Sequence, residues 1–292
     1  MLHGDKIKEL DALVSLIDEP NEEMYFEIRH KVISYGNQAI PVLEEAWVNT
    51  LGDNDSDRIE DLIENIRRND LRGQIDSWRS NTQNKLWDGY SILMQYVNPS
   101  IDLNTCNSIF EKINKEIWLE INENLTALEK IKVVNHVLFS VNEFGSSDIT
   151  NLPSDSFHLN KLMENRIANP FTLGVLYLAI AQNLNIPVYG VDLPGHFIAS
   201  YIDEKGPLKT AGQYKEGDVM FYINPANNGA VFTHNEIRHY INKMELELKP
   251  NYLLPTTNTN ILNRIIREMI VVYESENNQI KKEGLSEILM DI

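Results

Sequence analysis

The change of hydrophobic pattern that begins near residue 170 constrains the fold of this chain more than any other feature. Residues 171–185, FTLGVLYLAIAQNLN, predict an apolar helix of about four turns. Three runs rich in β-branched and aromatic residues follow, VYGVDL, HFIASYID and VMFYINP, and each predicts a strand. The segment THNEIRHYINKM then predicts a helix that begins with a capping box of Thr233 and Glu236. One helix, at least three adjacent strands and a further helix predict an α+β unit.

The rest of the chain shows helical periodicity. Near the N-terminus, three predicted helices resemble one HEAT-type helical repeat, a unit that is stable only beside stacked neighbours. The polar, turn-rich stretch 145–156 predicts a loop. Near the C-terminus an aliphatic stripe predicts a helix that faces the core; it consists of Ile261, Ile265, Ile266, Met269 and Val272. These patterns predict helical segments on both sides of the α+β unit.

The composition is typical of a soluble globular protein. Of the 292 residues, 42% are hydrophobic and 24% are charged. No run approaches the roughly 18 consecutive apolar residues that a membrane span needs. Residues 1–16 carry acidic side chains within their apolar pattern and show no signal-peptide cleavage site. The single cysteine, Cys106, fits a reducing compartment. We therefore expect a cytoplasmic protein without a membrane partner.

The net charge of −17 argues against nucleic acid as a partner, because the phosphate backbone would repel so acidic a chain. The densest group of basic residues lies within residues 58–79, where five arginines alternate with aspartates and glutamates at helical spacings. This alternation is typical of a solvated helix face with salt bridges rather than of a groove that binds nucleic acid.

The motifs of metal and cofactor sites are absent from the sequence. It contains no H-E-x-x-H, no C-x-x-C, no G-x-G-x-x-G after a strand and no Walker-type loop. His234 and His239 lie five residues apart, which differs from the i, i+4 spacing that places two side chains on one helix face. We expect neither a metal nor a cofactor.

The segment NPFTLGVLYLAIAQNLNIPVYGVDLPGHFIASY (169–201), followed by YINPANNG (222–229), resembles the transglutaminase-like family named after the SirB protein. Members show an Asn-Pro-aliphatic-Ser/Thr-Leu motif, an apolar helix, a Pro-Gly-His-Phe strand and a later Tyr-Ile-Asp-Pro strand. FHLNKLMENR is similar to the stretch before that helix, and NTNILNRIIREMIVVYE is similar to the region before a tetratricopeptide-type repeat. The motifs proper fall within residues 165–229.

The resemblance implies three regions. A HEAT-like helical region covers residues 1–80, and a transglutaminase-like core with a small antiparallel sheet covers residues 81–248. A short, tetratricopeptide-like helical tail covers residues 249–292. The expected fold is thus α+β, with the helical N-terminal region packed on a papain-like core.

The resemblance also implies a catalytic layout. In active members a cysteine at the N-terminus of the central helix is the nucleophile, because a helix N-terminus favours a thiolate. His196 takes the position of the base on the next strand, and Asn224 takes the position of the residue that orients the imidazole. The family usually shows aspartate at that last position, and an amide cannot stabilise an imidazolium by charge.

The nucleophile position departs from the family pattern. An ungapped comparison puts Pro170 there, and a shift of two residues puts Thr172 there. Proline cannot attack a substrate, and a threonine hydroxyl needs strong activation. We predict a vestigial or non-standard triad of Thr172, His196 and Asn224. The resemblance places four further residues along the same cleft: Arg166, Asn169, Pro170 and Gly195.

Each triad position also fits a structural role. Thr172 fits a cap of its helix, His196 fits a histidine bonded to a backbone carbonyl, and Asn224 fits the exit from a strand into a turn. Three hypotheses follow. The chain is a catalytically inactive domain that binds a protein or peptide, a hydrolase or acyltransferase that uses Thr172 or a bound water with His196 as base, or a purely structural protein.

Overall fold

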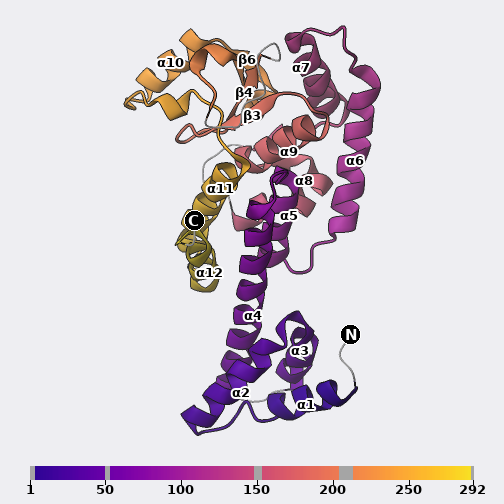
Figure 1. The fold of residues 1–292 in the computed structure, drawn as a ribbon, viewed down its shortest axis with the longest axis vertical. Coiled ribbons are helices and arrows are strands. Elements are labelled where there is room, and N and C mark those ends of the chain that lie inside the picture. Colours follow the sequence, from indigo (N-terminus) through magenta and orange to yellow (C-terminus); the bar gives the residue numbers. More distant parts are fainter. Residues whose placement is uncertain (1–3, 50–52, 148–152, 204–212, 291–292) are drawn as a thin grey trace. The chain divides into compact units, whose positions relative to one another are not determined.

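The chain divides into two compact units in the computed structural model, Met1–Ser77 and Trp78–Ile292. The structure describes residues 4–49, 53–147, 153–203 and 213–290 (Figure 1). Within these residues no helix has both the length and the hydrophobicity to cross a lipid bilayer.

The N-terminal unit consists of helices around one aliphatic core. They are α1 (Gly4–Val14), α2 (Glu22–Ser34), α3 (Ile40–Asn49) and α4 (Asp53–Ser80), the last of which continues beyond Ser77. Asn21 caps α2 by accepting hydrogen bonds from two backbone N–H groups of its first turn. Leu10, Val32, Leu43 and Leu62 are fully buried in this core. The helices predicted near the N-terminus are therefore present, and their likeness to a HEAT repeat stays a prediction.

Ion pairs join the helices of this unit on the surface. Among the described residues, ion pairs with N–O distances of 3.3 Å or less that cross between helices include Arg29–Asp61, Lys31–Glu9, Arg58–Glu22 and Arg67–Glu44. Two of the arginines in the predicted salt-bridged stretch, Arg58 and Arg67, thus pair with acidic residues of other helices. Because such pairs are solvated and screened, each contributes about 1 kcal/mol or less.

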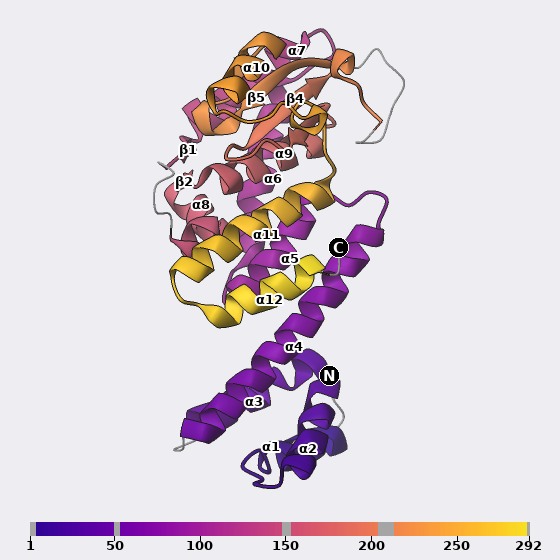
Figure 2. The same ribbon diagram turned by 90° about the vertical axis from the view of Figure 1, so that its left-hand side faces the viewer.

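The C-terminal unit begins with helices and ends with two helices that lie side by side (Figure 2). Its helices are α5 (Leu86–Val97), α6 (Leu103–Glu120), α7 (Ala127–Asn135), α8 (Leu159–Asn165), α9 (Pro170–Asn183), α10 (His234–Lys243), α11 (Asn258–Ser275) and α12 (Gln279–Met290). A π-helical segment, His136–Val141, follows α7. In α11 the predicted stripe is buried at four positions, and Val272 is half-buried.

The sheet of this unit has four antiparallel strands in the order β3-β4-β5-β6. The strands are β3 (Val188–Val191), β4 (Ile198–Ile202), β5 (Val219–Asn224) and β6 (Ala230–Phe232). Three match the predicted strands, and β6 continues the meander up to α10. The capping box of Thr233 and Glu236 at the start of α10 is confirmed. The predicted α+β class is confirmed as well.

Residues 145–156 are predicted to form a loop, but part of this stretch belongs to a second, smaller sheet. Here β1 (Gly145–Ser146) pairs in parallel with β2 (Ile167–Ala168), and residues 154–157 form a 3₁₀ turn. Residues 148–152 of this stretch lie outside the described residues. The sequence does not predict β1, because a strand of two residues is too short to produce an alternating pattern.

Side chains of the four-stranded sheet alternate between a face toward α9 and a face toward α10. Phe197, just before β4, packs on Gly174 of α9, where an added Cβ would overlap the phenyl ring. On the opposite face Ile198 and Tyr222 share a core with Ile237 of α10. The strand period of two therefore fixes which residues can face α9.

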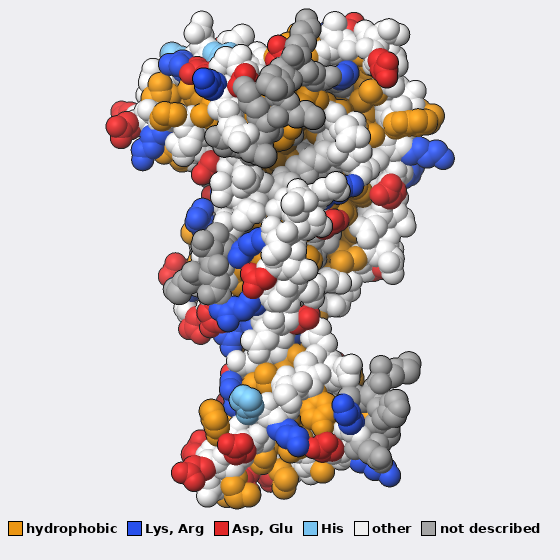
Figure 3. Space-filling view, in the orientation of Figure 1, with side chains coloured by type: hydrophobic (Ala, Val, Ile, Leu, Met, Phe, Trp, Pro, Cys, Tyr) orange, Lys and Arg blue, Asp and Glu red, His pale blue; other side chains and the backbone are white. Residues whose placement is uncertain are grey.

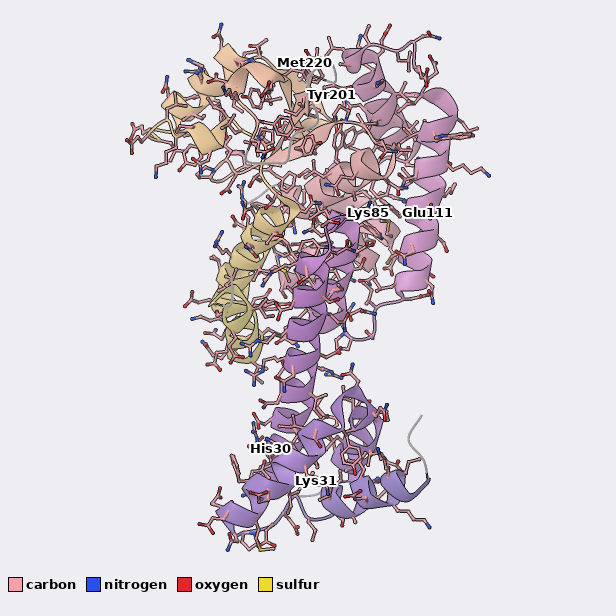
Figure 4. The ribbon with its side chains drawn as sticks, in the orientation of Figure 1. His30, Lys31, Lys85, Glu111, Tyr201 and Met220 are labelled. Carbon is pink, nitrogen blue, oxygen red and sulfur yellow. The ribbon has the colours of Figure 1, made fainter. Side chains whose placement is uncertain are left out.

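A polar network joins the ends of three helices in the C-terminal unit. Gln182, near the end of α9, accepts from the backbone N–H of Leu86 at 3.1 Å and donates to Asn258 at 2.8 Å. Asn258 begins α11 and donates to the carbonyl of Asn84 at 2.7 Å. Figure 4 labels Lys85, which precedes α5 at this junction. The side-chain amides satisfy backbone groups that the helix ends leave without a partner.

The turn after β5 is tied to α9 by one asparagine. The buried hydroxyl of Tyr177 in α9 donates to Oδ1 of Asn135 at 2.9 Å, and Nδ2 of Asn135 donates to the carbonyl of Gly229 at 2.9 Å. Gly229 has φ of +70°, which favours glycine. This contact sets the position of the turn that follows Asn224.

Candidate functional site

Asn169 caps the N-terminus of α9, where the resemblance places a nucleophile. Its Oδ1 accepts from the backbone N–H of Thr172 at 2.9 Å, and its Nδ2 donates to the carbonyl of Ser156 at 2.9 Å. Pro170 follows at the first helical position, where its missing N–H leaves no donor unpaired. Asn169 and Thr172 are fully buried, and Pro170 is buried beside them. The cap is therefore Asn169, and the expected cap at Thr172 is not formed.

The hydroxyl of Thr172 points into the core. Its Oγ1 lies 3.0 Å from the hydroxyl oxygen of Tyr90 and 3.4 Å from the carbonyl oxygen of Ser156. Tyr90 in turn donates to the carbonyl of Phe157 at 2.5 Å. Burial raises the pKa of Tyr90 well above its usual value, so this phenol stays neutral and serves as a donor. A hydroxyl in this setting is part of a buried hydrogen-bonded chain.

His196 lies in the turn between β3 and β4 and is half-buried. Its ring meets the ring of Tyr240 in α10 edge to face, with 4.9 Å between centroids. Burial, and to a lesser degree the charge of Arg264, lowers the pKa of His196 below its usual value. Neither ring nitrogen hydrogen-bonds to any part of the chain that the structure describes. The imidazole is thus neutral near pH 7 and has free donor and acceptor positions for a ligand.

Gly195 gives this turn its shape. It has φ of +74°, a left-handed conformation that residues with a Cβ rarely adopt. It is exposed, and the nearest atom to a Cβ built there would be the methyl group of Met244 at 3.5 Å. Met244 ends α10. The turn and the end of α10 thus form one surface beside His196, and we call Gly195, His196, Tyr240 and Met244 the His196 surface.

Arg264 of α11 donates hydrogen bonds to the backbone of β3 and of the turn that contains His196. Its Nη2 donates to the carbonyl of His196 at 2.9 Å, and its Nη1 donates to the carbonyl of Val191 at 3.4 Å. The same Nη1 lies 3.6 Å from Oδ1 of Asp192, and the guanidinium lies over the ring of Phe171 at 5.3 Å. Burial lowers the pKa of Arg264, and the negative charge of Asp192 opposes that shift.

The sequence offered one sign of this role. An arginine interrupts the aliphatic stripe of α11 one residue before Ile265, and buried arginines need partners. Arg264 is not among the residues that the sequence predicts for the site, because the sequence alone does not give the partner of a buried charge.

Comparison with known proteins identifies the second unit. Residues 105–267 match the model of a family described as "Transglutaminase-like superfamily". The chain belongs to the transglutaminase-like superfamily. Two curated relatives are each called "UPF0162 protein", one from Xylella fastidiosa strain 9a5c and one from strain Temecula1 / ATCC 700964. They are 27% identical to this chain over 186 and 182 residues, respectively.

The match to these relatives is partial. It covers 61% of this chain and 61% of the first relative, and 60% of each for the second. The chain therefore aligns with about three fifths of the length of either relative. No solved structure matches the chain significantly.

Among the described residues, no hydrogen bond joins Thr172, His196 and Asn224, the three residues of the predicted triad. Phe197 packs on Gly174 of α9, whereas the ring of His196, in the turn before β4, contacts Tyr240 of α10. Asn224 pairs with Ala230 at the end of β5, in a register that places it beside Ile198 on the α10 face. Thr172 lies on the α9 side. The hydroxyl of Thr172 thus bonds to Tyr90 of α5, whereas the imidazole of His196 contacts α10 and Asn224 has the register of that same face.

Asn224 occupies the end of its strand. It is half-buried, and its carbonyl accepts from the N–H of Gly229 at 3.0 Å, which closes the turn that Asn135 holds. Its side chain makes no capping bond to the 3₁₀ turn that follows. This is the strand-exit position expected from the Asn-Pro sequence.

The four residues predicted along the cleft differ in exposure and in their contacts. Asn169 and Pro170 are buried, and Gly195 is exposed at the His196 surface. Arg166 ends α8 with φ of +62°, and its guanidinium lies 4.7 Å from the centre of the Phe144 ring. Among the described residues, no group of three or more His, Cys, Asp or Glu side chains is placed to hold a metal ion.

Proposed function

We propose that the transglutaminase-like unit is a binding module that recognises a peptide or protein segment at the His196 surface and carries out no acyl transfer. The observation that carries this proposal is the position of the Thr172 hydroxyl, 3.0 Å from that of Tyr90 in the core, while His196 faces α10. Nucleophilic catalysis requires nucleophile and base within hydrogen-bond reach. Thr172 and His196 make their contacts with different helices, α5 and α10, which supports an inactive domain.

The His196 surface has the composition of a recognition site. It combines a neutral imidazole with free nitrogens, the half-buried ring of Tyr240 and the exposed thioether of Met244. Aromatic and methionine side chains supply apolar contact area, and the imidazole supplies one directed hydrogen bond. Arg264 fixes the backbone of the turn, which lowers the entropic cost of ordering it on binding.

A peptide-display selection on the full chain tests the binding function. Peptides selected on the wild type are measured again against His196→Ala and against His239→Ala, a change at an exposed histidine one residue from Tyr240. We expect at least about fivefold weaker binding for His196→Ala, which corresponds to the loss of one hydrogen bond, and no change for His239→Ala. Selected peptides that bind both variants as tightly as the wild type would contradict the proposal.

A second measurement tests the absence of acyl transfer. The wild type is assayed for hydrolysis of p-nitrophenyl acetate and for transfer of a glutamine-peptide acyl group to an amine. We expect rates equal to those of Thr172→Val and His196→Ala. Turnover that both substitutions abolish would support the hydrolase hypothesis instead.

The proposal also includes the subfamily to which this unit belongs. We propose a SirB-like domain with HEAT-like and tetratricopeptide-like flanks, supported by the order of the Asn-Pro, Pro-Gly-His-Phe and Tyr-Ile-Asn-Pro motifs. We also propose a cytoplasmic location without nucleic-acid or membrane partners. The buried free thiol of Cys106 and the net charge of −17 support it.

A further inference from the structure

A surface groove lies in the N-terminal unit where the C-terminal end of α1 faces α3. Its volume is about 600 Å³, and residues of α1, of the turn after it, of α3 and of α4 line it. The floor is aliphatic and includes Val14, Ile17, Val42 and Ile59. Figure 3 shows hydrophobic side chains at the surface of this unit among acidic and basic ones.

Carboxylates line both sides of this groove. Asp11 and Asp18 stand on the α1 side and Glu45 on the α3 side, and all three are exposed. None of the three carboxylates forms an ion pair within the described part of the chain. By contrast, Glu9 of α1 and Glu44 of α3 each pair with a basic residue of another helix. The groove thus presents negative charge on either side of an apolar floor, without cations of its own.

We propose that this groove binds a basic amphipathic helix of a partner protein. Such a helix carries an apolar stripe with Lys and Arg on its flanks, which is the complement of an aliphatic floor between two acidic walls. The net charge of −17 favours encounter with a cationic partner.

Two other occupants fit less well. A second copy of this chain would bring another 17 negative charges, and like charge opposes association. A small molecule needs a site that covers most of its surface, whereas the carboxylates here are exposed. The inference does not depend on the proposed function of the second unit, because it involves no residue of that unit.

A binding titration on the full chain tests this inference. The probe is a fluorescein-labelled synthetic peptide of about 18 residues with leucines on one helix face and lysines on the other, and the control peptide carries glutamates in place of the lysines. Fluorescence anisotropy at about 0.05 M salt measures the affinity, since screening is weak there. We expect the lysine peptide to bind and the glutamate peptide not to bind.

Two triple variants locate the binding site. Asp11→Asn/Asp18→Asn/Glu45→Gln removes the charge of the groove, and Glu23→Gln/Glu27→Gln/Glu60→Gln removes the same charge elsewhere on the unit. We expect about tenfold weaker binding for the groove variant, the sum of three exposed ion pairs, and less than about a twofold change for the control. Because both variants have the same net charge, the difference between them isolates the groove.

A neutral substitution tests the apolar floor. Ala46 lines the groove and is half-buried, so Ala46→Phe fills space without a change of charge. We expect at least about tenfold weaker binding with an unchanged circular dichroism spectrum, because the larger side chain excludes the peptide's leucines.

Four results would overturn the proposal. They are equal loss in both triple variants, loss in the control variant alone, equal binding of the two peptides, and no binding of the lysine peptide. A dimer of the free chain that Ala46→Phe dissociates would show a second copy as the occupant and would overturn it as well.

Discussion

The hydroxyl oxygens of Thr172 and Tyr90 lie 3.0 Å apart, and both side chains are fully buried. Because Tyr90 also donates to the carbonyl of Phe157, this pair is one link in a chain of hydrogen bonds between α5, α9 and the 3₁₀ turn before α8. A buried donor or acceptor that loses its partner is costly, so the pair contributes to stability rather than to catalysis.

We predict that Thr172→Val and Tyr90→Phe each destabilise the C-terminal unit by about 0.5–1.5 kcal/mol. The double variant should cost less than the sum of the two, because either change alone already breaks the same bond. Hydrogen exchange of the α9 amides, read by mass spectrometry, measures the effect in this unit alone. Additive costs in the double variant would mean that the two hydroxyls do not interact.

Gly174→Ala should destabilise the same unit by about 1–3 kcal/mol, since a Cβ at this position overlaps the ring of Phe197 and the core must shift. Its matched control is Gly217→Ala, where an added Cβ meets nothing within 4 Å, and a change within about 0.5 kcal/mol is expected. Urea unfolding followed by circular dichroism gives both values. If the two variants were equally stable, Phe197 would not pack on Gly174 of α9.

Part of this structure is predictable from local sequence. The strands follow from runs of β-branched and aromatic residues, and α9 follows from a long apolar run. The cap of α10 follows from the spacing of Thr233 and Glu236 alone, because a capping box is a local interaction.

The arrangement of the candidate site is not local. Asn169 and Thr172 are both good capping residues, and Asn169 caps α9 because its amide also reaches Ser156 of another element. The face on which His196 lies depends on the number of residues in the turn before β4, and a change of one residue would reverse it. Arg264 has its partners in β3 and the turn after it, more than 60 residues away in sequence. Such contacts depend on tertiary packing.

Gln182→Leu should destabilise the junction of α5, α9 and α11 by about 1–3 kcal/mol, because the N–H of Leu86 loses its acceptor and Asn258 loses a donor. Asn183→Ala is the control, since the side chain of Asn183 makes a single hydrogen bond to the described residues, a 3.4 Å bond that it accepts from the ammonium group of Lys85. A change within about 0.5 kcal/mol is expected there. Thermal unfolding by calorimetry measures both variants. A stable Gln182→Leu variant would show that the network carries no stability.

His196 should titrate below its usual pKa in the folded protein, because burial and the charge of Arg264 both disfavour the imidazolium. At pH values between the folded and the unfolded pKa, the unfolded chain therefore binds a proton at His196 that the folded chain does not bind. The stability due to the neutral imidazole is therefore present above about pH 6.5, the unfolded value, and is lost as the pH falls through the lower folded value. NMR titration of the imidazole C–H signals measures the pKa directly.

Arg264→Gln should raise the pKa of His196, since a positive charge is removed, whereas Arg264→Lys keeps the charge and should leave that pKa low. Arg267→Gln removes an exposed charge from the same helix and should leave it unchanged. A pKa of His196 that responded equally to the changes at Arg264 and Arg267 would contradict a specific contact between the turn and the buried guanidinium.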